Sequence, residues 1–392
     1  MRVLTGLDRL LASDLDALRG KRIGVVCHQA SIASDLHHIL DHLLLGHQQG
    51  RFSIGSVFGP QHGIWGHTQD NMIEWEGYRD PRTGLMYHSL YGEHRKPTPM
   101  MFRDLDLIVV DLQDVGSRYY TFIWTTFLTM EAAHELGLPV LVLDRPNPIG
   151  GMAVEGSGIE ADLQSFVGWR SLPHRHGMTI GEAAQLFRAR EFPHLDLQVI
   201  EMEGWTRRMH WPETGLHWAL PSPNMPTYDT ALVYPGGCLL EGTQASEGRG
   251  TTRPFEIFGA PYVNGSEFCA SLNEAGLPGA HFRPVQFQPT FQKHFGEVCE
   301  GAFLHVTERD AFRPVLTGIA ILQAFLRYHP NEFRWQVPPY EYVYDKDPID
   351  ILLGARWLRE AVENQTPLAQ IEERFRAEEA HFRAEAERIY PD

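Results

Sequence analysis

The chain has 392 residues, with 34 Lys and Arg against 50 Asp and Glu, and its formal net charge is −16. Hydrophobic residues make up 43% and charged residues 21%, a composition that excludes a disordered chain. An acidic chain lacks the positive field that a phosphate backbone requires, so the charge argues against nucleic acid and favours a small molecule or a neutral polymer as partner. At about 150 residues per domain, the length predicts two domains or three.

The cysteines and the apolar runs exclude several other classes. No CxxC pair occurs, so we expect neither disulfides nor a zinc site but reduced thiols in the core, at Cys27, Cys238, Cys269 and Cys299. The N-terminus lacks the apolar run of a signal peptide, and no later stretch reaches the roughly 20 apolar residues of a membrane span. We therefore expect a cytoplasmic protein with no membrane partner, unless a leader was removed.

Short apolar runs and helical stretches alternate through the first half of the chain. The runs have the character of strands buried on both faces and cover residues 23–27, 52–58, 105–113 and 139–144. Helical patterns cover residues 36–45, 122–136 and 179–188. Strands that alternate with helices form right-handed crossovers and a mostly parallel sheet. The predicted fold class is α/β, with a Rossmann-like, doubly wound sheet.

The pattern changes after residue 254. Spaced aromatic and β-branched runs at residues 282–291 and 303–307 precede a helical stretch at 318–328. A charged C-terminal helix then carries an apolar stripe of Ile371, Phe375, Phe382, Ala386 and Ile389. We expect a Rossmann-like catalytic domain over residues 1–254 and a smaller α+β domain over residues 255–392 that closes the cleft.

Polar residues gather where the predicted strands end. Those that follow the third and fourth strands are Asp111, Gln113, Asp114, Arg118, Asp144, Arg145 and Asn147. In open α/β sheets, ligands bind at the carboxyl ends of the strands, so these ends point to one crevice. No GxGxxG follows a strand, so we expect no dinucleotide cofactor.

Carboxyl groups at this crevice suit glycosidic cleavage, which needs an acid to protonate the leaving oxygen. Candidates for the acid are Asp111, Asp114, Asp144, Glu241 and Glu247. The alternative for each aspartate is a helix cap. For Glu247, in a glycine-rich loop, the alternative is an ion pair with Arg249 or Arg253.

Arginines in the same regions suit an anionic ligand. Arg249 and Arg253 stand beside Gly248 and Gly250, where a planar guanidinium and open backbone N–H groups could hold a carboxylate or a phosphate. Arg118, which Tyr119 follows, offers another positive group. Scattered surface salt bridges are the alternative for each arginine taken singly.

Metal and serine catalysis have weaker sequence support. His62, His67 and Asp70 lie close together but lack the HxxxH or HExxH frame of a metal site. Ser117 and Ser246 lie in predicted loops without a GxSxG elbow. We expect no metal and no cofactor, and a metal-dependent hydrolase built on the two histidines stays as an alternative.

Long motifs that occur in order along nearly the whole chain carry a family resemblance. They include GPQHGIWG, DLQDVGSRYYTF, VLDRPNPIGG, SPNMPTYDTALVYPG, CLLEGTQASEGRGTTRPFE and RDAFRPVLTG. The chain resembles the NamZ family of exo-β-N-acetylmuramidases. The resemblance implies an active site in the cleft between a Rossmann-like and a smaller domain. It also implies release of N-acetylmuramic acid from the non-reducing end of peptidoglycan fragments.

The sequence departs from the family pattern at one position. The usual motif is GPEHG, whose glutamate is the favoured catalytic residue, and Gln61 stands at that place. A carboxamide does not exchange a proton as a carboxyl does, so the role passes to another acid or is lost. Substitutes are Asp70, Glu74, Glu76, Asp114 and Glu247. A chain that lost the acid would be a non-catalytic binder or sensor of muramyl sugars.

The motifs supply the residues that the resemblance places in the site. Catalytic candidates are Glu247, Asp114, Asp111, His62 and Gln61. Candidates for substrate binding are Arg249, Arg253, Arg118, Tyr119, Gln113, Asp144, Arg145, Asn147 and Glu241. Our hypothesis is that Arg249 or Arg253, together with Arg118, binds the lactyl carboxylate of muramic acid. An acid then protonates the glycosidic oxygen, and the substrate's acetamido oxygen assists at the anomeric carbon.

Overall fold

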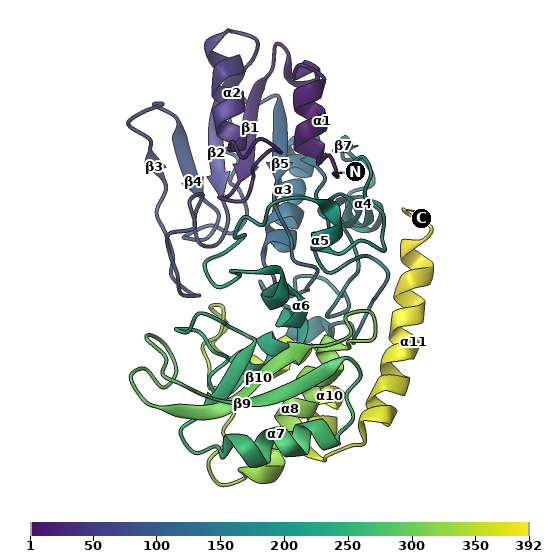
Figure 1. Cartoon of the computed structure of the whole chain (residues 1–392). Coiled ribbons are helices and arrows are strands. Elements are labelled where there is room, and N and C mark those ends of the chain that lie inside the picture. The colour runs from purple at the N-terminus through teal and green to yellow at the C-terminus, as the bar shows by residue number, and fades with distance from the viewer. Residues whose placement is uncertain (1, 391–392) are drawn as a thin grey trace.

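A seven-stranded sheet forms the first lobe of the computed structural model, which describes residues 2–390 (Figure 1). The strands, in the spatial order β3-β4-β2-β1-β5-β6-β7, are β3 (Tyr78–Arg79), β4 (Met86–Ser89), β2 (Ser53–Gly59), β1 (Arg22–Cys27), β5 (Leu107–Asp111), β6 (Val140–Leu143) and β7 (Leu197–Ile200). Every neighbouring pair is parallel except β3 with β4. The predicted α/β, mostly parallel sheet is confirmed.

Helices cover both faces of this sheet. They are α1 (Gly6–Ala12), α2 (Ile39–Gln48), α3 (Phe122–Leu136) and α4 (Ile180–Glu191). Figure 1 shows α1 and α2 in front of the strands and α3 behind them. Eleven of the 15 residues of α3 are buried, so this helix runs through the interior rather than over the surface. Its N-terminus therefore lies inside the molecule.

The second lobe is a three-stranded antiparallel sheet with helices. Its strands, in the order β8-β10-β9, are β8 (Ile257–Ala260), β10 (Cys299–Val306) and β9 (Ala280–Phe287). The helices that accompany it are α7 (Gly265–Glu274), α8 (Pro314–Tyr328), α9 (Pro348–Leu353) and α10 (Arg356–Glu363). The predicted smaller α+β unit is confirmed.

Helix α11 (Leu368–Ala386) runs along one side of the molecule from the second lobe to the first (Figure 1). Its predicted apolar stripe is buried, apart from Ile389, which lies beyond the end of the helix and is half-buried. The guanidinium of Arg190 binds both carboxylate oxygens of Glu385 at 2.7 Å. The helix is thus fixed to both lobes.

The segment between the two sheets carries α5 (Trp211–Thr214), α6 (Tyr228–Gly237) and the short 3-10 helix η3 (Cys238–Gly242). Helix α6 packs on α8, and η3 packs on α9. The boundary that we expect after residue 254 falls at the end of this segment. Two further 3-10 turns, η1 (Asp16–Leu18) and η2 (Ala161–Leu163), lie in the first lobe.

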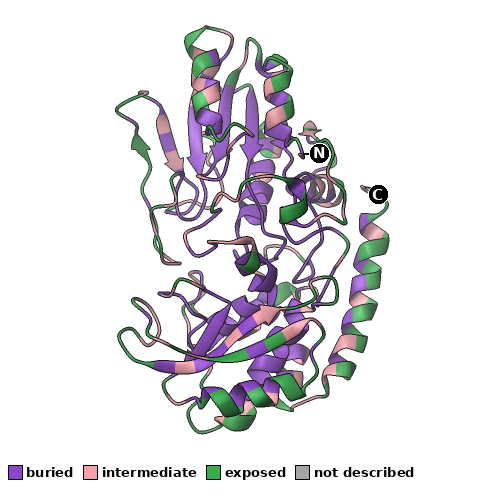
Figure 2. Cartoon of the chain, in the orientation of Figure 1, coloured by how far each residue is buried: buried purple, intermediate pink, exposed green. Residues whose placement is uncertain are grey.

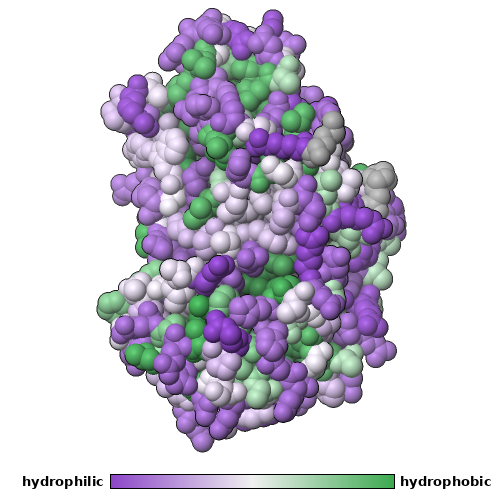
Figure 3. Space-filling view, in the orientation of Figure 1, coloured by the Kyte–Doolittle hydropathy of each residue, from purple (hydrophilic) through white to green (hydrophobic). Residues whose placement is uncertain are grey.

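Burial follows the layers. Figure 2 shows mostly buried strands in the middle of the first lobe and exposed residues on β9 and on the outer faces of α2, α7 and α11. The face seen in Figure 3 is mostly hydrophilic, and its apolar residues form small separate groups. The four cysteines are buried and unpaired, as predicted. Among residues 2–390, no helix combines the length and the apolar character that crossing a membrane requires.

Two glycines let the backbones of α6 and α8 touch. A Cβ atom added at Gly236 would lie 1.9 Å from the carbonyl oxygen of Pro314, and one at Gly318 would lie 2.5 Å from the oxygen of Gly236. No side chain fits there. This close approach sets the position of α6 and of η3 after it.

We predict that Gly236→Ala lowers the free energy of unfolding by about 3 kcal/mol, because the new methyl group overpacks a backbone contact. Urea denaturation measures the change. Ser266→Ala, at an exposed position of α7, is the control and should stay within about 0.5 kcal/mol of the wild type. Equal stabilities for the two variants would contradict the close approach.

Candidate active site between the lobes

A small cavity of ≈ 40 Å³ lies between the lobes and is lined by residues of both. Residues 61–62, directly after β2, and residues 119–122, at the start of α3, form the wall from the first lobe. Glu241 of η3 and Arg249 before β8 line it from the segment between the two sheets, and residues 340–341 before α9 line it from the second lobe. The carboxyl end of a central strand thus meets three segments that lie far along the chain.

Glu341 is the acid closest to Gln61. The Gln61 side-chain amide donates to Oε1 of Glu341 at 3.4 Å, and the Tyr91 hydroxyl donates to its Oε2 at 2.7 Å. Gln61 in turn accepts a hydrogen bond of 2.7 Å from the Thr121 hydroxyl. Burial raises the pKa of Glu341 to about 7. This carboxyl therefore keeps its proton up to neutral pH.

Sequence reasoning missed Glu341. It is 280 residues from Gln61 and lies in an irregular segment, PPYEYVYD, that belongs to no predicted helix or strand. The signal that was available is an acidic residue between two tyrosines after a Pro-Pro pair, in a stretch with no periodicity of its own. Nothing in that pattern indicates which strand end it approaches.

A network of paired charges forms the other side of the cavity. The Arg249 guanidinium donates to Oε1 of Glu241 at 2.6 Å and lies 3.3 Å from Oε1 of Glu247. Lys293 donates to the other oxygen of Glu247 at 2.7 Å, and the Tyr340 hydroxyl donates to Glu241 at 2.7 Å. Two cations balance two carboxylates. The ion pair that was the alternative for Glu247 is present, and the charge of Arg249 is compensated.

His62 is a neutral group of the cavity wall. Its Nδ1 lies 2.7 Å from the carbonyl oxygen of Thr68, so Nδ1 carries the proton and Nε2 is left as an acceptor. Burial, with a smaller contribution from the nearby Arg249 charge, lowers the pKa of His62 to about 4. In the described part of the chain, no three His, Cys, Asp or Glu side chains come together as metal ligands. The alternative metal site at His62, His67 and Asp70 therefore has no ligand set.

Asn71 of the segment 69–72 lines the cavity from the first lobe. Hydrogen bonds that hold this segment include those of Asn224 to the carbonyl of Gln69 at 2.7 Å, of Gln292 to the side chain of Asn71 at 2.8 Å, and of the Tyr342 hydroxyl to the carbonyl of Met72 at 2.8 Å. The closed cavity has room for only a few water molecules. A sugar ring is larger than this space, so the walls of the cavity must separate for a sugar to bind.

Both parts of the chain match one family. Residues 23–229 match the family model for the N-terminal part of the exo-β-N-acetylmuramidase NamZ, and residues 232–390 match the model for its C-terminal part. The chain belongs to the NamZ family. The peptidoglycan β-N-acetylmuramidase NamZ of Bacillus subtilis (strain 168) is 42% identical over 370 residues, which are 94% of this chain and 86% of the relative.

Solved structures of similar proteins agree with the fold. A DUF1343 family protein from Bacteroides fragilis NCTC 9343 superimposes with a TM-score of 0.87 and 30% sequence identity, covering 99% of this chain and 98% of that one. A second DUF1343 family protein from the same organism gives 0.76 and 25%, with the same coverage. The two-lobed architecture is therefore shared along the whole chain.

Of the residues that the sequence placed in a NamZ site, Gln61, His62, Tyr119, Glu241 and Arg249 line the cavity. Glu247 lies behind Arg249, which it contacts. The Tyr119 hydroxyl donates to the carbonyl of Pro235 at 2.7 Å, which fixes the start of α3 against α6.

Other predicted residues hold the loops of the NamZ fold rather than line the cavity. Asp111 and Arg145 form a buried ion pair, and Arg118 donates to carbonyl oxygens that include Leu352 of the second lobe. Asp114 accepts from the N–H of Gly116, as an aspartate in a turn does. Gln113 and Asn147 donate to the backbone carbonyls of Pro146 and Met178, respectively. Arg253 pairs with Glu256 at 3.2 Å and is 40% exposed.

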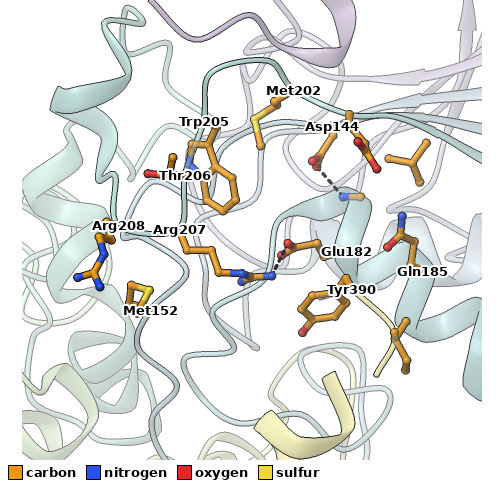
Figure 4. A pocket seen from close by; sticks show the side chains of 14 residues that line it. Asp144, Met152, Glu182, Gln185, Met202, Trp205, Thr206, Arg207, Arg208 and Tyr390 are labelled. Atoms are coloured by element: carbon orange, nitrogen blue, oxygen red, sulfur yellow. Dashed lines mark hydrogen bonds and ion pairs between the residues drawn. The ribbon is translucent and has the colours of Figure 1, made fainter. Parts of the chain in front are cut away.

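A larger cavity, ≈ 810 Å³, lies elsewhere in the first lobe, and Figure 4 shows its walls. Asp144 lines it, with a carboxylate that accepts the N–H of Gly181 at 2.8 Å and so caps the start of α4. Burial raises the pKa of Asp144 to about 6. In Figure 4, Arg207 reaches Glu182 across the floor, beside the ring of Tyr390. The helix-cap alternative thus describes Asp144, which lies outside the interlobe cavity.

We predict that Arg249→Met lowers the free energy of unfolding by about 3–5 kcal/mol, because it leaves two buried carboxylates without their shared partner. Arg19→Met is the control and should cost no more than about 1 kcal/mol, because Arg19 and its partners Asp14 and Asp16 are all exposed and exposed ion pairs contribute little. Guanidinium denaturation of both variants provides the comparison. A loss for Arg249→Met no larger than for the control would show that the pairing does not stabilise the fold.

Proposed function

We propose that this chain is an exo-acting glycoside hydrolase that releases N-acetylmuramic acid from the non-reducing end of peptidoglycan fragments. The observation that carries the proposal is the carboxyl of Glu341, which is buried in a cavity between the two lobes with two neutral partners and whose pKa burial raises to about 7. Family membership and the activity named for the Bacillus subtilis relative support the choice of substrate.

Glu341 has the properties that a general acid needs. An acid that protonates a glycosidic oxygen must hold its proton at working pH and yet give it up in the transition state, which a pKa near 7 allows. Gln61 cannot do this, but its amide donates to Oε1 of Glu341 and so fixes the carboxyl. We assign the acid to Glu341 and a positioning role to Gln61.

The second half of the reaction does not require a second free carboxylate. Glu241 is bound to Arg249 and Tyr340, so it is poorly placed to attack carbon. A 2-acetamido sugar can supply its own acetamido oxygen to the anomeric centre, and water then opens the intermediate. His62 offers an unprotonated Nε2 in the cavity wall that can accept a proton from that water.

An enclosed cavity favours action at a chain end. Residues from both lobes, Asn71 and Glu341 among them, line the space, so a terminal sugar fits better than the middle of a glycan strand. We propose muramyl oligosaccharides, down to the disaccharide with N-acetylglucosamine, as substrates.

We predict that the wild type releases free N-acetylmuramic acid from the muramyl disaccharide with N-acetylglucosamine, whose sugar alkoxide must be protonated as it leaves. Glu341→Gln should lower kcat about 10²- to 10⁴-fold, since the amide cannot donate the proton. For the wild type, kcat/KM should fall as the pH rises through about 7, because the raised pKa of Glu341 means that the acid loses its proton there.

Glu300→Gln is the control for this experiment. Glu300 is a carboxyl of β10 that lies outside the cavity and bonds to Gln286, and its loss should leave kcat unchanged. If the wild type binds muramyl sugars but releases no N-acetylmuramic acid, the chain is a binder of muramyl sugars and not a hydrolase. Full activity in Glu341→Gln would remove Glu341 as the acid.

A further inference from the structure

The N-terminus of α3 opens onto the interlobe cavity, because residues 119–122 line it. Trp124 and Thr125 donate their N–H groups to the carbonyl of Thr121, at 3.0 and 2.8 Å. The N–H groups of Phe122 and Ile123 have no hydrogen-bond acceptor among the residues that the structure describes. Two backbone donors are thus left at this end of a buried 15-residue helix.

No side chain of the helix satisfies or neutralises this end. The first turn contains no acidic residue, and the N-cap residue Thr121 makes no capping hydrogen bond. Its hydroxyl donates to Gln61 instead. The partial positive charge at the start of α3 therefore faces the cavity without the carboxylate that usually accompanies a helix N-terminus.

Tyr120 is a second, independent observation at the same place. Tyr120 lines the cavity, and only 6% of its surface is exposed. Its hydroxyl has no hydrogen-bond partner in the described chain. The Ser222 side chain, another residue of the wall, is close enough to interact weakly with this hydroxyl, but the pair lacks the geometry of a full hydrogen bond. A buried hydroxyl without a partner is costly, and a ligand that accepts from it removes the cost.

The arginines of the region are already engaged. Arg249 is neutralised by Glu241 and Glu247, and Arg118 donates to backbone carbonyls away from the cavity. Neither offers an uncompensated cation to an anionic group. In this wall, the first N–H groups of α3 and the Tyr120 hydroxyl are still able to donate a hydrogen bond to a ligand.

We propose that the N-terminus of α3 and the Tyr120 hydroxyl together bind a carboxylate of the substrate. In a muramyl sugar this group is the lactyl carboxylate, so the assignment rests on the proposed function. The site selects muramyl over glucosaminyl sugars by three neutral donors and a helix dipole rather than by an arginine. A carboxylate bound there also favours the protonated form of the nearby acid Glu341, because two negative charges in one dry cavity repel.

The test is calorimetric titration of the full chain with N-acetylmuramic acid, its methyl ester and N-acetylglucosamine. The wild type should bind the free acid at least tenfold more tightly than the other two. Tyr120→Phe should weaken binding of the acid about tenfold, the effect of losing one hydrogen bond to a charged group. Binding of the methyl ester and of N-acetylglucosamine should not change.

Tyr262→Phe is the matched control, because Tyr262 also has a hydroxyl without a partner in the described chain but lies outside the cavity. It should leave all three affinities unchanged. Equal affinity of the wild type for the acid and the ester, or equal losses for the acid and the two uncharged ligands in Tyr120→Phe, would overturn the proposal.

Failure of this inference is distinct from failure of the proposed function. Release of N-acetylmuramic acid by the wild type with no selective effect of Tyr120→Phe overturns the carboxylate site and leaves the hydrolase. Selective binding of the acid without any release of N-acetylmuramic acid supports the carboxylate site and overturns the hydrolase. Melting temperatures of both tyrosine variants, expected to match the wild type within a few degrees, separate a binding defect from unfolding.

Discussion

The cavity between the lobes depends on the pairing of Arg249 with Glu241 and Glu247. Each of these groups is buried, and a buried charge is tolerated only when a partner compensates it. Because Lys293 completes the set, three segments far apart in the chain converge on one point: η3, the glycine-rich loop before β8 and the loop between β9 and β10. The wall that faces the first lobe is built on this balance.

Burial has a different effect on Glu341, because no cation among the described residues pairs with this carboxyl. Its hydrogen-bond partners, Tyr91 and Gln61, are neutral, so no cation bonds to its carboxylate form and burial favours the proton. Glu241 and Glu341 thus lie in one cavity with different partners, one bound to a guanidinium and one to uncharged groups. Of these two carboxyls, Glu241 is held in an ion pair, and Glu341 is the one whose neutral surroundings favour the protonated form.

Fold class was predictable because apolar runs such as that of β5 are long enough to show their burial on both faces. The two-residue strand β3 and the helix α6, which contains Pro235, give no such signal. In the site, residues 61–62 were predictable because they follow a strand directly. Glu341 was not, because its position depends on packing between lobes and not on local pattern.

The predicted role of the arginines shows what residue type alone leaves undecided. A guanidinium can bind a ligand or satisfy the protein's own acceptors, and only the contacts decide: Arg118 binds carbonyl oxygens and Arg249 binds two glutamates. Because these charges are compensated locally, the net charge of −16 does not decide whether the cavity can bind an anionic group. An acidic protein can hold an anionic sugar when neutral donors, such as the first N–H groups of α3, point at the place where the anion lies.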